Sequence, residues 1–150
     1  MSSTITPATL TVTHTESVTL NGVDRGVTNT LTIASINEID HRIVSVDTAA
    51  ARTLLTLGTT VGAGAFLKAN IKYIRITNKD NTNYATLGML DTSGDTAYVK
   101  LEAGQTFCMY NDDLEAFTNG AAFSAFSEID TFNAQANTAD VDLEVFVAST

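Results

Sequence analysis

Residues 8–22 read ATLTVTHTESVTLNG, and threonine fills every second position through most of this stretch. The two alternating sets are Thr9, Thr11, Thr13, Thr15 and Thr19 on one side, and Leu10, Val12, Val18 and Leu20 on the other. A period of two residues is typical of a β-strand with one face toward a core and the other toward water. Threonine suits the wet face, because its branched Cβ favours extended backbone and its hydroxyl tolerates solvent. Asn21-Gly22 closes the stretch with a strong hairpin signal, since both residues accept positive φ.

The same alternation recurs along the whole chain and predicts an all-β fold with about eight to ten short strands. The expected strands cover residues 8–20, 27–33, 43–46, 52–57, 71–77, 84–90, 97–101, 106–110, 123–136 and 141–148. Regular turn spacing and the absence of any composition break predict one antiparallel β-sandwich domain over residues 8–150, with a closed barrel as the alternative. The polar residues 1–7, which end in the only proline, predict a flexible N-terminal arm.

Residues 47–57 allow two interpretations. Asp47 could cap a short helix over residues 49–52 that Gly58 would end. Alternatively, residues 52–57 form a strand with Leu55 and Leu57 inward. Short apolar runs cannot be assigned by periodicity alone, and we favour the strand.

Two other segments predict how strands are buried. Residues 71–77, IKYIRIT, have apolar side chains on both parities, which indicates an inner strand with some cover on each face. Residues 141–148 alternate cleanly and predict Val141, Leu143, Val145 and Val147 inward, with Asp142 and Glu144 outward.

Composition excludes several functions. The 150 residues carry a net charge of −9, which disfavours a nucleic-acid partner because the chain would repel phosphate backbones. No apolar run reaches the roughly 18–20 residues that span a bilayer, so no membrane partner is expected. The first residues lack the features of a secretory signal, which predicts synthesis in a cytoplasm without export. The single cysteine, Cys108, excludes an internal disulfide framework and a cysteine-based zinc site.

The two histidines are the obvious candidates for a general base. His41 follows Asp40, which could orient an imidazole, but the sequence pairs no nucleophile with it. His14 lies within the first expected strand on the parity of Val12. We interpret both as surface or strand-edge residues and predict that the chain is not an enzyme and has no catalytic or cofactor-binding residues.

Acidic residues gather in three places, Asp91/Asp95, Asp112/Asp113/Glu115 and Asp140/Asp142/Glu144. Paired acids can hydrolyse glycosides, but this chain has no tryptophan to line a sugar cleft. Calcium is the better functional interpretation of residues 111–113 and 80–83, which offer clustered oxygen ligands. Neither matches a dedicated calcium loop, and Asx turns explain both, so no metal site is predicted.

Three further features have plain structural interpretations. The glycine-rich residues 58–64 lack the Lys-Ser/Thr pair of a phosphate loop, which favours a hinge or subunit-contact loop. Cys108, beside Phe107 and Met109, is expected to be an inert small hydrophobe. Phe117, Phe123, Phe126 and Phe132 indicate core filling, with an apolar contact patch as the alternative.

The second half of the chain carries a family pattern. Residues 72–84, KYIRITNKDNTNY, are followed after one hairpin by residues 100–107, KLEAGQTF. This pairing resembles small β-jelly-roll virion proteins of tailed bacteriophages, particularly those of marine phages and cyanophages. Residues 138–145, TADVDLEV, fit their final strand, so the resemblance spans residues 71–147.

The resemblance implies a non-enzymatic capsid decoration (cement) protein on the virion exterior, made in the host cytoplasm. Its partners would be the major capsid protein and further copies of itself, most often as a homotrimer. The family has no catalytic motif to carry over. A head–tail connector or tail-associated virion protein is the alternative, and a carbohydrate-binding jelly-roll module is a more distant one that the missing tryptophan disfavours.

Overall fold

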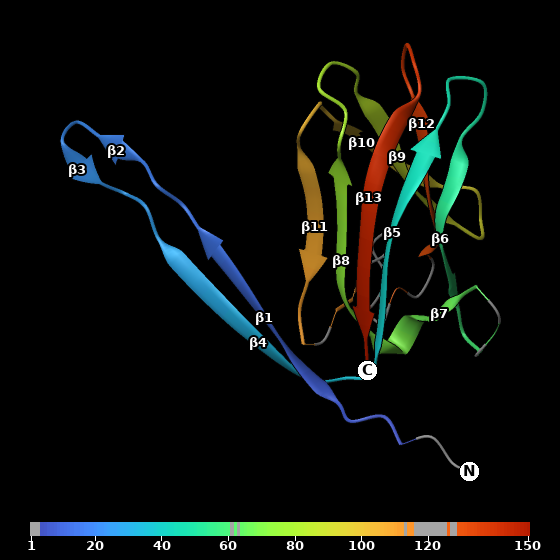
Figure 1. Ribbon diagram of the computed structural model, residues 1–150, viewed down its shortest axis with the longest axis horizontal. Helices are drawn as coiled ribbons and strands as arrows, with labels where there is room; N and C mark the ends of the chain where they lie inside the picture. Colours follow the sequence, from blue (N-terminus) through green and yellow to red (C-terminus); the bar gives the residue numbers. More distant parts are fainter. Residues whose placement is uncertain (1–3, 61, 63, 113, 116–125, 127–128) are drawn as a thin grey trace.

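Two antiparallel sheets packed face to face form the body of the protein (Figure 1). The computed structural model describes residues 4–60, 62, 64–112, 114–115, 126 and 129–150. The front sheet has the order β11-β8-β13-β5, and the back sheet β10-β9-β12-β6 with the short β7 at its edge. Their bounds are β5 (Glu38–Val46), β6 (Arg52–Gly58), β7 (Phe66–Leu67), β8 (Ile71–Asn78), β9 (Ala85–Asp91), β10 (Thr96–Leu101), β11 (Thr106–Tyr110), β12 (Ile129–Ala136) and β13 (Val141–Ser149). A 3₁₀ turn, η1 (Lys68–Asn70), precedes β8.

The strand pairing is that of a jelly roll. The eight long strands of the body pair as one folded hairpin, outermost with outermost: β5 with β13, β6 with β12, β8 with β11 and β9 with β10. Rolling this hairpin onto itself adds the pairs β13–β8 and β12–β9, which complete the two sheets. The all-β sandwich expected from the sequence is therefore confirmed, with a jelly-roll order of strands.

The core lies between the two sheets. β13 contributes Val141, Leu143, Val145 and Val147, all fully buried, as its alternation predicts. Phe132 of β12 is also fully buried, and its ring meets those of Phe107 and Phe126. Core filling is thus confirmed for Phe126 and Phe132, while Phe117 and Phe123 lie outside the described residues.

Residues 47–57 form a turn followed by a strand, as favoured. Asp47 does act as a cap, because its Oδ1 accepts hydrogen bonds from the amides of Ala49 and Ala50 at 2.9 and 3.2 Å. The turn does not continue as a helix, since its alanines are exposed and gain no burial. β6 begins at Arg52 and places Leu54, Leu55 and Leu57 in the core.

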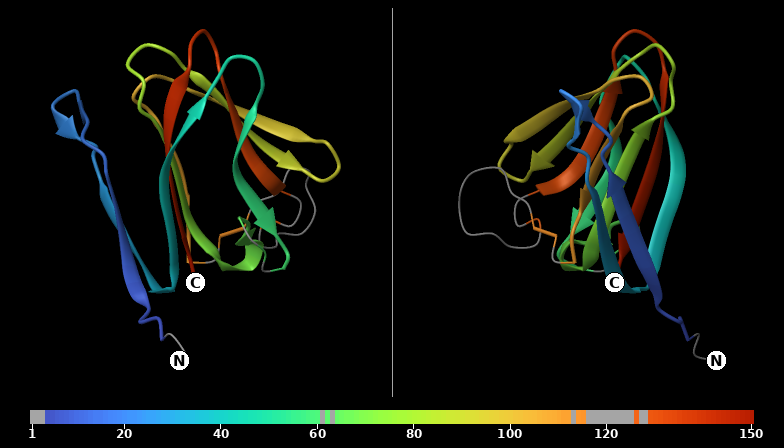
Figure 2. Two further views of the ribbon diagram at one scale, coloured as in Figure 1. Left: turned by 45° about the vertical axis from the view of Figure 1, so that its right-hand side comes forward. Right: turned by 90° about the vertical axis from the view of Figure 1, so that its left-hand side faces the viewer.

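The first 29 residues after Pro7 form a separate two-stranded unit, which we call the ribbon (residues 8–36). It consists of β1 (Ala8–Thr15), β2 (Thr19–Leu20), β3 (Val23–Asp24) and β4 (Thr28–Ile36). Among the described residues β1 pairs with β4 alone, in register from Leu10↔Ile33 to Thr15↔Thr28. Figures 1 and 2 show the ribbon leaving the sandwich near the C-terminus, with its tip standing clear.

These strands differ from the expected set in number and in length. The described residues contain thirteen strands, because the expected strand over residues 8–20 is interrupted at residues 16–18 and the short strands β3 and β7 are added. β4 and β5 are longer than expected, since β4 continues to Ile36 and β5 begins at Glu38, whereas β12 begins at Ile129 rather than at residue 123. Among the described residues the ribbon packs on the sandwich through its base, and the assignment of residues 8–150 to one domain stays a prediction. Residues 4–7 are exposed and belong to no strand, and the flexibility of residues 1–7 stays a prediction.

Candidate interaction surface

Threonines line one face of the ribbon in directly opposed pairs. Thr13 lies opposite Thr30 with their Oγ1 atoms 3.4 Å apart, and the Thr28 hydroxyl donates to Thr15 Oγ1 at 3.3 Å. All four side chains are exposed. This is the wet face that the alternation predicted, and the paired hydroxyls stiffen a ribbon that has no third strand.

The tip of the ribbon is a tight turn with apolar flanks. Asn21 and Gly22 have φ of 51° and 77°, the left-handed pair that a two-residue hairpin turn of type I′ requires. Leu20 and Val23 lie opposite each other on either side of the turn. Together with Val18 and Val27 they form the tip patch, whose side chains are 46–61% exposed.

The base of the ribbon faces the sheet β11-β8-β13-β5. The side of this sheet that is turned away from the core is called the outer face. Cross-strand register places its side chains in three rows of four, one from each strand. The rows are Thr106, Thr77, Glu144 and Ile43; Cys108, Arg75, Phe146 and His41; and Tyr110, Tyr73, Ala148 and Ile39. The cover predicted for both faces of residues 71–77 is therefore present, with this outer face shared by polar, aromatic and apolar groups.

Glu144 is the electrostatic centre of the outer face. Its Oε1 accepts a hydrogen bond from Arg75 Nη2 at 2.6 Å and lies 3.2 Å from His41 Nε2, while its Oε2 is 3.6 Å from Lys79 Nζ. The Arg75 hydrogen bond, with the nearby cations, holds the pKa of the Glu144 carboxyl below its ordinary value. Glu144 thus offsets part of the positive charge that Arg75 and Lys79 bring to this face of an otherwise acidic chain.

Aromatic rings join this cluster to the ribbon. Tyr73 meets Phe146 edge to face, and the Arg75 guanidinium lies 5.7 Å from the Phe146 ring centre. Burial, followed by a hydrogen bond to Cys108, raises the pKa of Tyr73 to about 12. Ile33 and Ile36 at the ribbon base are buried against this cluster and Ala148.

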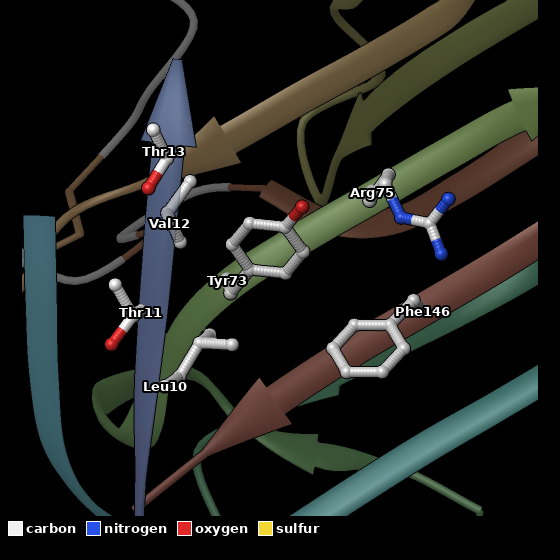
Figure 3. A pocket seen from close by; sticks show the side chains of 7 residues that line it. All are labelled: Leu10, Thr11, Val12, Thr13, Tyr73, Arg75 and Phe146. Carbon is white, nitrogen blue, oxygen red and sulfur yellow. The ribbon is translucent and has the colours of Figure 1, made fainter. Parts of the chain in front are cut away.

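Between the ribbon and the outer face lies an open groove of about 250 Å³ (Figure 3). β1 lines one side with residues 10–13, and Tyr73, Arg75 and Phe146 line the other. Leu10 and Val12 are half-buried here, whereas the tip patch further along the ribbon is exposed. The groove, the outer face and the tip patch together form the candidate interaction surface.

The two histidines lie in different parts of this surface. His14 is exposed on β1, with Nε2 3.6 Å from Glu16 Oε1. His41 is exposed on β5, where its ring centre lies 5.6 Å from that of Phe146 with the planes tilted by 59°, and it pairs with Glu144 rather than with the adjacent Asp40. Asp40 pairs with Arg42 instead. Both side chains are on the surface, as expected.

The oxygen-rich turns are Asx turns. Asp80 Oδ1 accepts from the amides of Thr82 and Asn83 at 2.7 and 2.6 Å, which lowers the pKa of its carboxyl. Asp91 Oδ1 likewise accepts from the amides of Ser93, Gly94 and Asp95. These carboxylates therefore accept hydrogen bonds from backbone amides within their own turns. Among the described residues no three His, Cys, Asp or Glu side chains are grouped to hold a metal ion.

The remaining acidic residues and loops are placed as follows. Asp112 and Glu115 are exposed near the end of β11, Asp140 and Asp142 are exposed at the start of β13, and Asp113 lies outside the described residues. Residues 58–64 connect β6 to β7, with 61 and 63 outside the described set, so their hinge or contact role stays a prediction. Cys108 has an exposed position on the outer face, but partial burial of its thiol raises the pKa of that group, which disfavours the reactive thiolate.

The outer-face cluster was not identified from the sequence. Arg75 and Glu144 are 69 positions apart, and their pairing depends on the β13–β8 register. The one available signal was the presence of apolar side chains on both faces of residues 71–77, which indicated that part of the protein packs on the outer face. The base of the ribbon packs there, on Tyr73 and Phe146.

Within the described ranges no helix is long and apolar enough to cross a membrane. Comparisons of the chain with protein-family models, with curated proteins and with solved structures gave no match. The interaction surface is therefore interpreted from its own geometry and chemistry.

Proposed function

We propose that this chain is a non-enzymatic virion structural protein that binds the outer surface of a tailed-phage head as a decoration (cement) protein. Its partners would be the major capsid protein and other copies of itself. The observation that carries the proposal is the ribbon, a projecting element that, among the described residues, packs on its own body at the base and exposes four apolar side chains at its tip. An element of this kind is suited to contact with another chain.

The jelly-roll body agrees with this role without deciding it. Eight-stranded jelly rolls occur in viral capsid proteins, but also in lectins and cupins. The resemblance of residues 71–147 to phage virion proteins falls on β8 to β13, which form most of both sheets. Avidity would then make many weak subunit contacts sufficient for stable attachment.

Acidic charge supports a position on the outside of a particle. With a net charge of −9 the chain gains nothing from contact with packaged nucleic acid. The same charge keeps a densely arrayed protein from associating at random. The specific contacts must then come from surfaces where this charge is neutralised or sparse, such as the outer face and the ribbon.

Quantitative mass spectrometry of purified particles tests this role. The particles come from the phage that encodes the chain, and copies are counted relative to the major capsid protein. Hundreds of copies per particle are expected for decoration. Roughly six or twelve copies, the numbers set by a symmetric neck or tail ring, would instead place the chain there. Absence from particles would overturn the proposal.

A further inference from the structure

The structure points to a second copy of this chain as the partner of the ribbon: we infer that the tip patch of one copy packs on the exposed isoleucines of β5 in its neighbour. This inference deepens the proposed function and rests on it only for the assembly role of the ribbon. The receiving site, which we call the edge patch, consists of Ile39 and Ile43.

The distal half of the ribbon lacks the burial that would stabilise it. An isolated two-stranded hairpin is marginal in water, and one hydrophobic face against another surface is what makes such a unit stable. The base has that contact through Ile33 and Ile36, whereas Leu20 and Val23 are 61% and 50% exposed. Within the part of the chain that the structure describes, the tip patch therefore has no packing partner.

The ribbon is longer than the strands of its own sandwich. From Ile36 out to Val23 the extended chain spans roughly 40 Å at about 3.3 Å per residue, whereas the nine-residue β13 spans roughly 30 Å. Figures 1 and 2 show the tip standing clear of the body. The ribbon thus has the reach to contact a neighbouring molecule.

Charge favours ribbon-to-body contact over body-to-body contact. Glu16, Asp24 and Arg25 are the charged residues of the ribbon, which gives it a net charge of −1 and leaves −8 for the rest. Two bodies approaching each other therefore repel, while a nearly neutral ribbon meets a body with little penalty. The ribbon is the part of the chain best suited to join copies.

The edge patch is exposed and apolar, as the tip patch is. Ile39 and Ile43 are 57% and 64% exposed, and they flank His41 on the outer face of the edge strand β5. Beside them Glu144 is already paired with Arg75, so packing apolar groups there leaves no carboxylate without a partner. Because each copy carries both patches, a symmetric closed oligomer satisfies all of them at once.

Disulfide trapping between two differently tagged variants tests the contact. Both variants carry Cys108→Ser; one adds Leu20→Cys and the other Ile43→Cys. The two are mixed and mildly oxidised, and the products are identified by intact mass. A mixed disulfide between the tip and edge variants is expected in excess over the two homodimeric disulfides, and this excess should fall to the random proportion when the mixture is unfolded before oxidation.

The matched control replaces Ile43→Cys with Tyr98→Cys, another highly exposed position but on β10 of the opposite sheet. A mixed disulfide no more abundant than with this control would overturn the inference, whether the protein is a monomer or an oligomer joined elsewhere. Light scattering gives a second readout. The wild type is expected to have the mass of a closed oligomer, and Leu20→Asn with Val23→Asn the mass of one chain.

These outcomes are separable from the proposed function. A monomer without the mixed disulfide that still occurs at high copy number in virions would contradict the ribbon contact alone. An oligomer with the disulfide that is absent from virions would contradict the decoration role alone.

Discussion

Tyr73 and Phe146 meet edge to face beneath the ribbon base, with ring centres 5.6 Å apart and planes inclined by 83°. The pair joins β8 to β13 on the outer face, and Ile33 of the ribbon packs against it. The sandwich and the ribbon therefore share one small aromatic cluster, through which the orientation of the ribbon depends on the outer face.

Replacing Ile33 with alanine should loosen this junction. The Tyr73 pKa of about 12 arises first from burial, so exposing the ring should lower its pKa toward the ordinary value of 10. Absorbance titration of tyrosinate measures the change. Thr32→Ala, on the exposed face of the same strand, is the control and should leave the titration as in the wild type. An unchanged late-titrating tyrosine in Ile33→Ala would contradict burial of Tyr73 by the ribbon.

Stability should fall on the acid side through Glu144. Its folded-state pKa lies below the ordinary value of 4.5, chiefly through the Arg75 hydrogen bond. The stabilisation is therefore present above pH 4.5 and is lost as pH falls through the lower folded-state value.

Glu144→Gln should accordingly be less stable than the wild type at neutral pH, and the difference should shrink as the pH falls below 4.5 and through the lowered folded-state pKa of Glu144. Urea unfolding across this range measures it. Asp47 and Asp80 also have lowered pKa values, but both remain in the variant, so the comparison isolates Glu144. A difference that stays constant with pH would show that the Glu144 charge is not involved.

Gly26→Ala should disrupt the distal half of the ribbon. A Cβ at this position would lie 2.3 Å from the backbone carbonyl oxygen of Glu16, which cannot move without breaking the strand pairing. A local cost of about 1–3 kcal/mol is expected for such overpacking. Hydrogen exchange should quicken around Glu16 and Val27 while β13 stays protected. Gly62→Ala, where an added Cβ meets nothing within 4 Å, serves as the control.

Phe132→Ala should be among the most damaging core substitutions. The side chain is fully buried between the rings of Phe107 and Phe126, so removing it leaves a cavity. The expected loss in free energy of unfolding is about 3–5 kcal/mol. Tyr98→Ala, at a 69% exposed position, should change it by less than about 0.5 kcal/mol. Equal effects of the two substitutions in denaturant unfolding would be inconsistent with this core.

The strands and their faces could be predicted because a period of two is a local signal. Val141 to Val147 face the core as their spacing requires, and Asn21-Gly22 makes the expected turn. The position of the first hairpin could not be predicted, because alternation does not say which sheet a strand joins. A bulge near the ribbon base, where Ser35 has φ of 62°, shifts the β1–β4 register there, and such a bulge is likewise not readable from alternation.

The candidate surface was predictable only in part. Asx turns at residues 80–83 follow from side chains that bond their own backbone, so the sequence was sufficient. The row that joins Arg75, Phe146 and His41 depends on pairing between three strands far apart in the chain. The partner of the ribbon depends on a surface that a single chain does not cover.

Adding the purified protein to phage heads that lack it tests the decoration role most directly. After sedimentation, bound protein is measured against the major capsid protein as the added amount is raised. We expect the protein to sediment with the heads and to saturate at a fixed ratio to the capsid protein, as a repeated surface site requires. Protein that remains in the supernatant at every added amount would contradict a role on the capsid exterior.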